Sequence, residues 1–228
     1  METTAIMQDK KELHALSLRK VLLFCGILYP LIYIAADMLG TLSYEDYSYF
    51  SQNVSEILAI DSPVRPFTLP VFNLSDLILI AFSAGVWLTA GQKRSLRTTG
   101  ILLVMCAVTG FVTSIFFPMH LRDAEKTLTD TMHIILTSVL SLFILASIGF
   151  GGASFGKRFR IYSIVTIAVL LVFGALTGIQ GPKIGTGMPT PWMGITERVN
   201  IYSYIIWVLV LALMLLRIEK GNGKPPVH

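Results

Sequence analysis

Asp76 is the residue with the clearest chemical potential, because the apolar run Leu77–Phe82 follows it directly. If this segment crosses a membrane, an ionised side chain within it costs several kcal/mol unless it is paired or hydrated. We therefore expect Asp76 to face the interior of a helix bundle. There it could serve as a ligand, a proton relay or a catalytic acid or base, or it could clamp one helix to another.

His133 and Asp130 lie three residues apart at the start of another apolar run, so a helix would place them on one face. Asp130 suits the first turn, where a carboxylate stabilises the positive end of the helix dipole. His133 could act as a general base or bind a metal. His120, Asp123 and Asp130 are metal-ligand candidates because imidazoles and carboxylates at one membrane face could hold a divalent cation. No HxxxH or HExxH spacing supports such a site, and no cofactor is predicted.

Two polar pairs lie next to other apolar runs. Glu197 and Arg198 open the last run, where they could stabilise the helix start and reach lipid headgroups. Alternatively, this pair could form an intramembrane ion pair with Asp76 or Glu56. Ser55 and Glu56 lie in the long loop after the first run. The candidate ligand-binding residues are Ser55, Glu56, Asp76, His133, Glu197 and Arg198.

The composition is that of a membrane protein. Apolar residues make up 54% of the 228-residue chain and charged residues 14%, against about 25% in an ordinary soluble domain. This balance excludes a soluble enzyme, a nucleic-acid-binding module and a disordered chain. Since about 20 apolar residues cross a bilayer as a helix, the sequence predicts an all-α, polytopic bundle of six transmembrane helices. The six runs are roughly Val21–Leu39, Pro70–Ala90, Thr98–Phe117, Thr131–Phe150, Arg160–Ile179 and Thr196–Leu216.

The charge distribution predicts the orientation. If both termini are cytoplasmic, 13 of the 18 Lys and Arg residues lie on the inner side, as the positive-inside rule requires. Most of the acidic residues then lie at or near the outer face, so we expect an outer ligand to be cationic or to hydrogen-bond to carboxylates. The expected location is the cell membrane, with the lipid bilayer as partner and no nucleic acid.

The chain divides into three predicted parts. Residues 1–20 form a polar cytoplasmic lead-in, residues 21–217 the six-helix membrane domain, and residues 218–228 a disordered cytoplasmic tail. Within the first outer loop, apolar Val54, Ile57 and Leu58 beside polar Ser55 and Glu56 predict a short amphipathic helix along the outer leaflet.

Four short motifs resemble a known family. They are Asn53-Val54-Ser55-Glu56-Ile57-Leu58 after the first span, Phe117-Pro118 at the end of the third, His133 at the start of the fourth, and Gly194-Ile195-Thr196-Glu197-Arg198-Val199 at the start of the sixth. Over about residues 20–216 the chain resembles the bacterial and archaeal six-span family catalogued as domain of unknown function 998. The resemblance implies six helices and no established activity. The family has an acid two residues after Phe-Pro, where this chain has His120.

The family's polar signatures map to Ser55, Glu56, His133, Glu197 and Arg198, all on the predicted outer side. We therefore expect an outward-facing polar pocket that binds a small ligand or a lipid headgroup. Two alternatives remain: a membrane-embedded lipid hydrolase, with or without a metal, and a small-solute or proton-coupled transporter that uses Asp76.

Helical rise sets the expected geometry of this pocket. Asp76 would lie at its floor, with Arg198 or His133 as its charge partner, and Glu56 would fold over it as a lid. Packed apolar side chains would seal the inner half, which makes this a pocket and not a channel.

Overall fold

The computed structural model describes the backbone of residues 2–122, 124–184, 186 and 188–222, and the side chains of residues 16–122, 124–184, 186, 188–219 and 221. The described chain is helical and has no strand. Its helices are α1 (Glu2–Ser43), α2 (Val54–Ile57), α3 (Arg65–Thr89), α4 (Arg94–Phe116), α5 (Leu128–Ala153), α6 (Lys157–Gln180) and α7 (Met193–Asn222), with a 3₁₀ turn at Gly181–Lys183.

Six of these helices are long and apolar enough to cross a membrane, which confirms the predicted six-span, all-α class. Each helix begins before its apolar run, and most include polar residues there. In α5, for example, Thr127 and Asp130 form a capping box, so Asp130 has the expected first-turn position. At the other end of the chain α7 runs to Asn222, so residues 218–222 are helical where a disordered tail was expected. Residues 223–228 lie outside the described residues.

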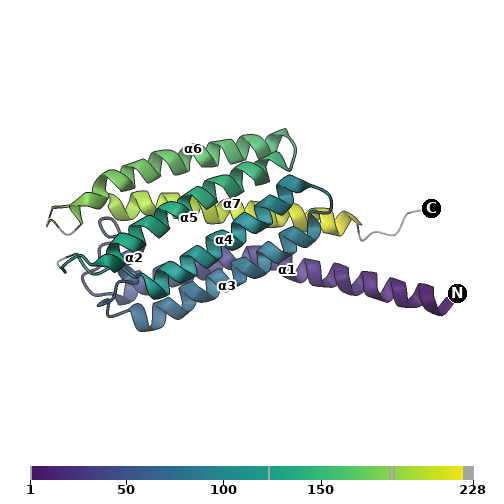
Figure 1. The fold of residues 1–228 in the computed structure, drawn as a ribbon, viewed down its shortest axis with the longest axis horizontal. Helices are drawn as coiled ribbons and strands as arrows, with labels where there is room; N and C mark the ends of the chain where they lie inside the picture. The colour runs from purple at the N-terminus through teal and green to yellow at the C-terminus, as the bar shows by residue number, and fades with distance from the viewer. Residues whose placement is uncertain (1, 123, 185, 187, 223–228) are drawn as a thin grey trace.

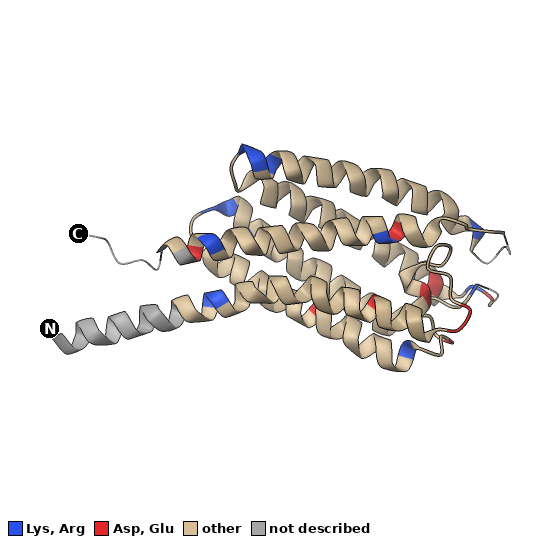
Figure 2. Cartoon of the chain, turned by 180° about the vertical axis from the view of Figure 1, so that it is seen from behind, with Lys and Arg blue, Asp and Glu red and all other residues tan. Residues whose placement is uncertain are grey.

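The six long helices form a closed ring in chain order. Each one packs against its neighbours in sequence, and α7 closes the ring against α1 (Figure 1). The helix α1 begins, and α7 ends, at one end of the bundle, which we call the tail end (Figure 1). The opposite end carries α2 and is called the α2 end. Acidic residues gather at the α2 end and most basic residues at the tail end (Figure 2). Which end faces the cytoplasm stays a prediction.

The loop helix differs from the amphipathic helix expected on the leaflet. It is a single turn, started by a capping box between Asn53 and Glu56. Its side chains Val54, Glu56 and Ile57 are buried inside the protein, so this turn packs inward against the bundle. The reason is that Glu56 finds polar partners within the protein, as shown below.

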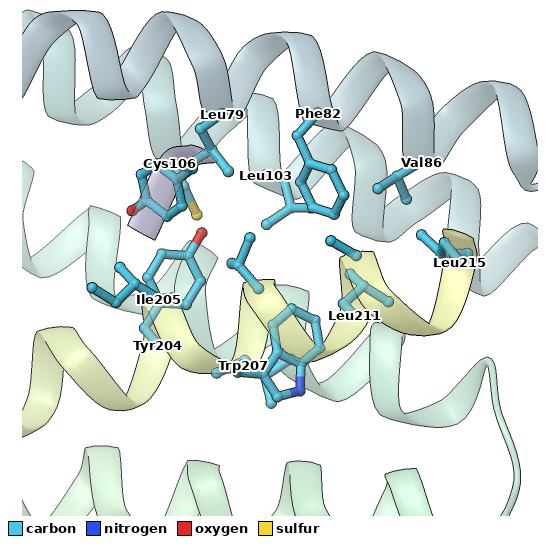
Figure 3. Packing of buried hydrophobic residues seen from close by; sticks show 14 of the residues in the cluster. Leu79, Phe82, Val86, Leu103, Cys106, Tyr204, Ile205, Trp207, Leu211 and Leu215 are labelled. Carbon is cyan, nitrogen blue, oxygen red and sulfur yellow. The ribbon is translucent and has the colours of Figure 1, made fainter. Parts of the chain in front are cut away.

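Apolar side chains fill the middle of the bundle toward the tail end. Leu79 and Phe82 of α3, Leu103 of α4 and Leu211 of α7 meet there (Figure 3). Trp207 of α7 is fully buried, and its indole Nε1–H donates to Ser163 Oγ at 2.9 Å. The ring of Trp207 occupies the space that a side chain at Gly151 of α5 would need. These contacts close the bundle core on the tail side of the site described next.

Candidate functional site

A cavity of about 600 Å³ lies within the ring, toward the α2 end. All six long helices and α2 contribute to its wall, which is mostly apolar. Its aromatic side chains are Tyr29 and Tyr33 of α1, Phe72 of α3 and Tyr204 of α7. The hydroxyl of Tyr204 points toward Cys106 (Figure 3). This volume is within the range of small-molecule sites.

Four of the six candidate residues line this cavity: Ser55, Asp76, His133 and Glu197. Asp76 projects from α3 against Gly110 of α4, where a Cβ would lie 3.3 Å from the Asp76 carboxylate oxygen. Among the described residues, Asp76 has no hydrogen-bond or ion-pair partner within contact distance. The carboxylate therefore faces the cavity, and the expected pairing with Arg198 or His133 is wrong.

Glu197 connects α7 to the loop turn. Its Oε2 accepts a hydrogen bond from the backbone N–H of Val54 at 2.5 Å. This N–H belongs to the first turn of α2 and has no acceptor within its own helix. Glu197 therefore fixes α2 over the cavity while its side chain lines the wall.

His133 bridges α5, the end of α4 and α2. Its Nδ1 lies 2.8 Å from the carbonyl oxygen of Phe117, and its Nε2 lies 3.2 Å from Ser55 Oγ. A carbonyl oxygen only accepts hydrogen bonds, so Nδ1 carries the proton and Nε2 accepts from the Ser55 hydroxyl. The ring is thereby held in one tautomer and one orientation.

Arg198 pairs with Asp37, and not with Asp76 or Glu56. Its Nε and Nη2 donate to the two carboxylate oxygens of Asp37 at 2.9 and 2.8 Å. The Tyr202 hydroxyl donates to the same carboxylate at 2.6 Å. Asp37 is not among the candidate residues named from the sequence, although a carboxylate inside the first apolar run was the signal that could have found it.

The remaining donors of Arg198 bind the loop after α1. Nη1 donates to the carbonyls of Tyr49 and Gln52, at 2.9 and 3.1 Å, and Nη2 to the Tyr47 hydroxyl at 2.9 Å. Burial raises the pKa of Tyr47, while Arg198 opposes this shift, so the hydroxyl stays protonated and donates to the Asn53 carbonyl at 2.8 Å. Arg198 is therefore a structural clamp outside the cavity wall.

Glu56 is fully buried and is not a lid. Its carboxylate accepts from Arg122 Nε at 2.9 Å and Nη2 at 2.7 Å, and from Gln52 Nε2 at 2.8 Å. Arg122 also donates to Thr190 Oγ1 at 2.6 Å and to the Ser51 carbonyl at 2.7 Å. Arg122, which is not among the candidates named from the sequence, thus joins the three loops of the α2 end.

The metal candidates do not form a shared site in the part of the chain that the structure describes. His120 and Asp130 hydrogen-bond to each other, with Nδ1 and Oδ2 2.8 Å apart, and Asp130 also caps α5. Asp123 lies outside the described residues. No cluster of three or more His, Cys, Asp or Glu side chains suited to a metal occurs among the described residues.

Comparisons with known proteins agree with the resemblance seen in the motifs. No curated protein matches the chain, and no solved structure matches it. One family model, described as a protein of unknown function (DUF998), matches residues 27–214. This range contains every cavity-lining candidate named above and the greater part of the chain. The chain belongs to the DUF998 family of membrane proteins.

Proposed function

We propose that this protein binds an amphipathic molecule with a cationic group in the cavity at the α2 end. The observation that carries the proposal is the Asp76 carboxylate, which lines the cavity wall and has no partner among the described residues. A carboxylate in such a setting is costly to keep and is retained where it serves a function. A bound cation would balance the negative charge of the Asp76 carboxylate.

The rest of the wall supports the same ligand class. Glu197 adds a second carboxylate, and no Lys or Arg lies among the described lining residues. Tyr29, Tyr33 and Phe72 offer aromatic faces, which attract ammonium groups through cation–π interactions. An anionic headgroup would instead meet two carboxylates without a balancing cation.

The apolar part of the wall fits an aliphatic segment of the ligand. Leu79, Leu145 and Leu170 line the cavity on its deeper side. A molecule with an ammonium group near Asp76 and a hydrocarbon portion against these leucines would satisfy both surfaces. Such a molecule could be a lipid with an amine headgroup or a smaller cationic amphiphile, and the test must separate these two sources.

The proposal is tested on purified protein in lipid nanodiscs with octyltrimethylammonium as the probe and octyl sulfate as its anionic counterpart. We expect octyltrimethylammonium to raise the unfolding temperature of the wild type and octyl sulfate to leave it unchanged. Asp76→Asn should abolish the response. Asp61→Asn, which removes an exposed carboxylate outside the cavity wall, should keep it.

Equal responses to the two probes, or an unchanged response in Asp76→Asn, would overturn the proposal. The source of the ligand is read separately by native mass spectrometry. Retention of phosphatidylethanolamine over phosphatidylglycerol by the wild type indicates a lipid headgroup. A wild type that binds octyltrimethylammonium and retains neither lipid selectively indicates a smaller amphiphile.

A further inference from the structure

We propose that Ser55 and His133 form a nucleophile and general-base pair that cleaves carboxylic esters at the cavity wall. Both side chains line the cavity, and Ser55 Oγ lies 3.2 Å from His133 Nε2. This separation is within the reach required for proton transfer from a nucleophile to its base. The inference needs the cavity to admit an amphiphile, but it does not depend on the ligand being cationic.

The histidine has the tautomer that this chemistry requires. Because Nδ1–H donates to the Phe117 carbonyl at 2.8 Å, the Nε2 lone pair is directed at the serine hydroxyl. A third group that orients the base is the recurring feature of activated serine nucleophiles. Here the backbone carbonyl at the end of α4 takes that position.

Ser55 is held by contacts on both sides along the chain. The N–H of Val54 binds Glu197, and the carboxylate of Glu56 binds Arg122. The side chain of Asn53 accepts from the Glu56 N–H at 2.9 Å and completes the capping box. A single helical turn anchored at three points holds its middle side chain in one place, as a preorganised nucleophile requires.

Other serines of the cavity wall have a different environment. Ser138 and Ser141 of α5 donate to carbonyls one turn earlier in their own helix, at 2.8 and 2.9 Å. The hydroxyl of Ser114 on α4 has two acceptors, Asn73 Oδ1 at 2.9 Å and the Phe111 carbonyl at 3.0 Å. These are ordinary ways for a hydroxyl to be satisfied in a membrane helix. Among the described lining residues, the imidazole contact singles out Ser55.

The proposed reaction has two steps. Ser55 Oγ attacks the carbonyl carbon of the ester and passes its proton to His133 Nε2. The bond from that carbon to the alcohol oxygen then breaks, and the alcohol leaves with the proton from Nε2. Water attacks the resulting acyl-Ser55 ester, His133 again takes and returns a proton, and the carboxylic acid and free Ser55 are released.

The wall favours a carboxylic ester over a phosphate ester. A phosphodiester would carry its negative charge toward Asp76 and Glu197, whereas an acyl ester is neutral before the reaction. The side-chain amide of Asn200 also lines the cavity and is a donor of the type that stabilises a developing oxyanion. The substrate class is therefore an acylated amphiphile.

The test uses an alkyl fluorophosphonate, which reacts with activated serines, on the wild-type protein in nanodiscs without any cationic ligand. We expect one label per chain, mapped by mass spectrometry to Ser55. Ser55→Ala should lose the label, and His133→Gln should slow labelling by about 10²- to 10⁴-fold. Ser43→Ala removes an exposed hydroxyl outside the cavity wall and should label as the wild type does. The thermal unfolding of each variant shows that it is folded.

An unlabelled wild type, or a label that persists in folded Ser55→Ala, overturns the inference. Hydrolysis of p-nitrophenyl octanoate by the wild type, lost in Ser55→Ala, is the expected companion result. The two proposals can fail separately. If the wild type binds octyltrimethylammonium but takes no label, the binding proposal stands and the nucleophile proposal is overturned. If Ser55 is labelled but octyltrimethylammonium does not bind, the nucleophile proposal stands and the binding proposal is overturned.

Discussion

Arg198 of α7 donates hydrogen bonds to both carboxylate oxygens of Asp37 on α1, with nitrogen–oxygen distances of 2.8 and 2.9 Å. The two side chains are 2% and 0% exposed, so the pair is buried. Since α7 and α1 are the last and first helices, this pair closes the ring at its seam. Two parallel hydrogen bonds from a planar guanidinium give this contact a fixed geometry. We therefore regard this ion pair as the main polar contact that holds α1 against α7.

Replacing Arg198 by Lys should destabilise the protein although the charge is kept. An ammonium cannot bind both Asp37 oxygens and the loop carbonyls at once. We expect a loss of about 1–3 kcal/mol in the free energy of unfolding, from the buried hydrogen-bonding groups left without a partner, measured by denaturation in mixed micelles. Arg94→Lys, at an exposed position, is the control and should change little. A loss below about 1 kcal/mol for Arg198→Lys would show that the contact with Asp37 depends on charge alone.

The sequence predicted the position of each polar residue along its helix better than it predicted which side chains that residue contacts. Hydropathy located all six spans, because the bilayer demands long apolar runs whatever their neighbours. It also indicated which polar residues lie at the α2 end. The pairing of Arg198 with Asp37 joins residues 161 positions apart, so it depends on which helix closes the ring. Nothing in the local pattern around either residue encodes that choice.

The same limit explains the errors in the candidate site. Ser55, Asp76, His133 and Glu197 line one cavity, because all four lie toward the α2 end of the bundle. Glu56 was expected in the cavity as well, but it forms an ion pair with the partly exposed Arg122 and does not line the wall. Arg122 lies in a loop, where sequence gives little indication of tertiary contacts.

Gly194 should not tolerate a side chain. A Cβ at this position would clash with the carbonyl oxygens of Tyr49 and Gln52, because α7 starts against the loop backbone there. Gly194→Ala is expected to cost about 1–3 kcal/mol, measured as a lower unfolding temperature. Gly178→Ala, in a helix with open space around the position, should be neutral or stabilising by up to about 1 kcal/mol. Equal effects at the two positions would contradict the close approach.

Removing Arg122 should loosen the loops of the α2 end without unfolding the bundle. Arg122→Gln leaves the buried Glu56 carboxylate without its ion-pair partner. Since a quarter of the Arg122 side chain is exposed, we expect a cost of about 2 kcal/mol, below that of a fully buried pair. Hydrogen exchange of residues 51–56 and 188–192 should accelerate, while the middle of α7 keeps its protection. Lys126→Gln, at an exposed position of the same loop, is the control.

The orientation of the bundle can be read by cysteine labelling in intact cells. In a chain whose own cysteines are removed by Cys25→Ala and Cys106→Ala, we place a single new thiol at either end. An impermeant maleimide should react with Glu125→Cys from outside. It should react with Gln92→Cys only after the membrane is opened, because the basic loop is expected inside. The reverse pattern would invert the predicted topology.

Replacing Asp by Asn should raise the free energy of unfolding at position 76 and lower it at position 37. Asp37→Asn removes the partner of a buried guanidinium and is expected to cost about 3–5 kcal/mol. Asp76→Asn removes a carboxylate that has no partner among the described residues, so it should raise the free energy of unfolding by about 1 kcal/mol. Both are measured on ligand-free protein in the same micelles. If Asp76→Asn destabilises the protein as Asp37→Asn does, Asp76 has a structural role and holds the helices together. A gain in stability together with lost binding of octyltrimethylammonium would mark Asp76 as a residue kept for its ligand.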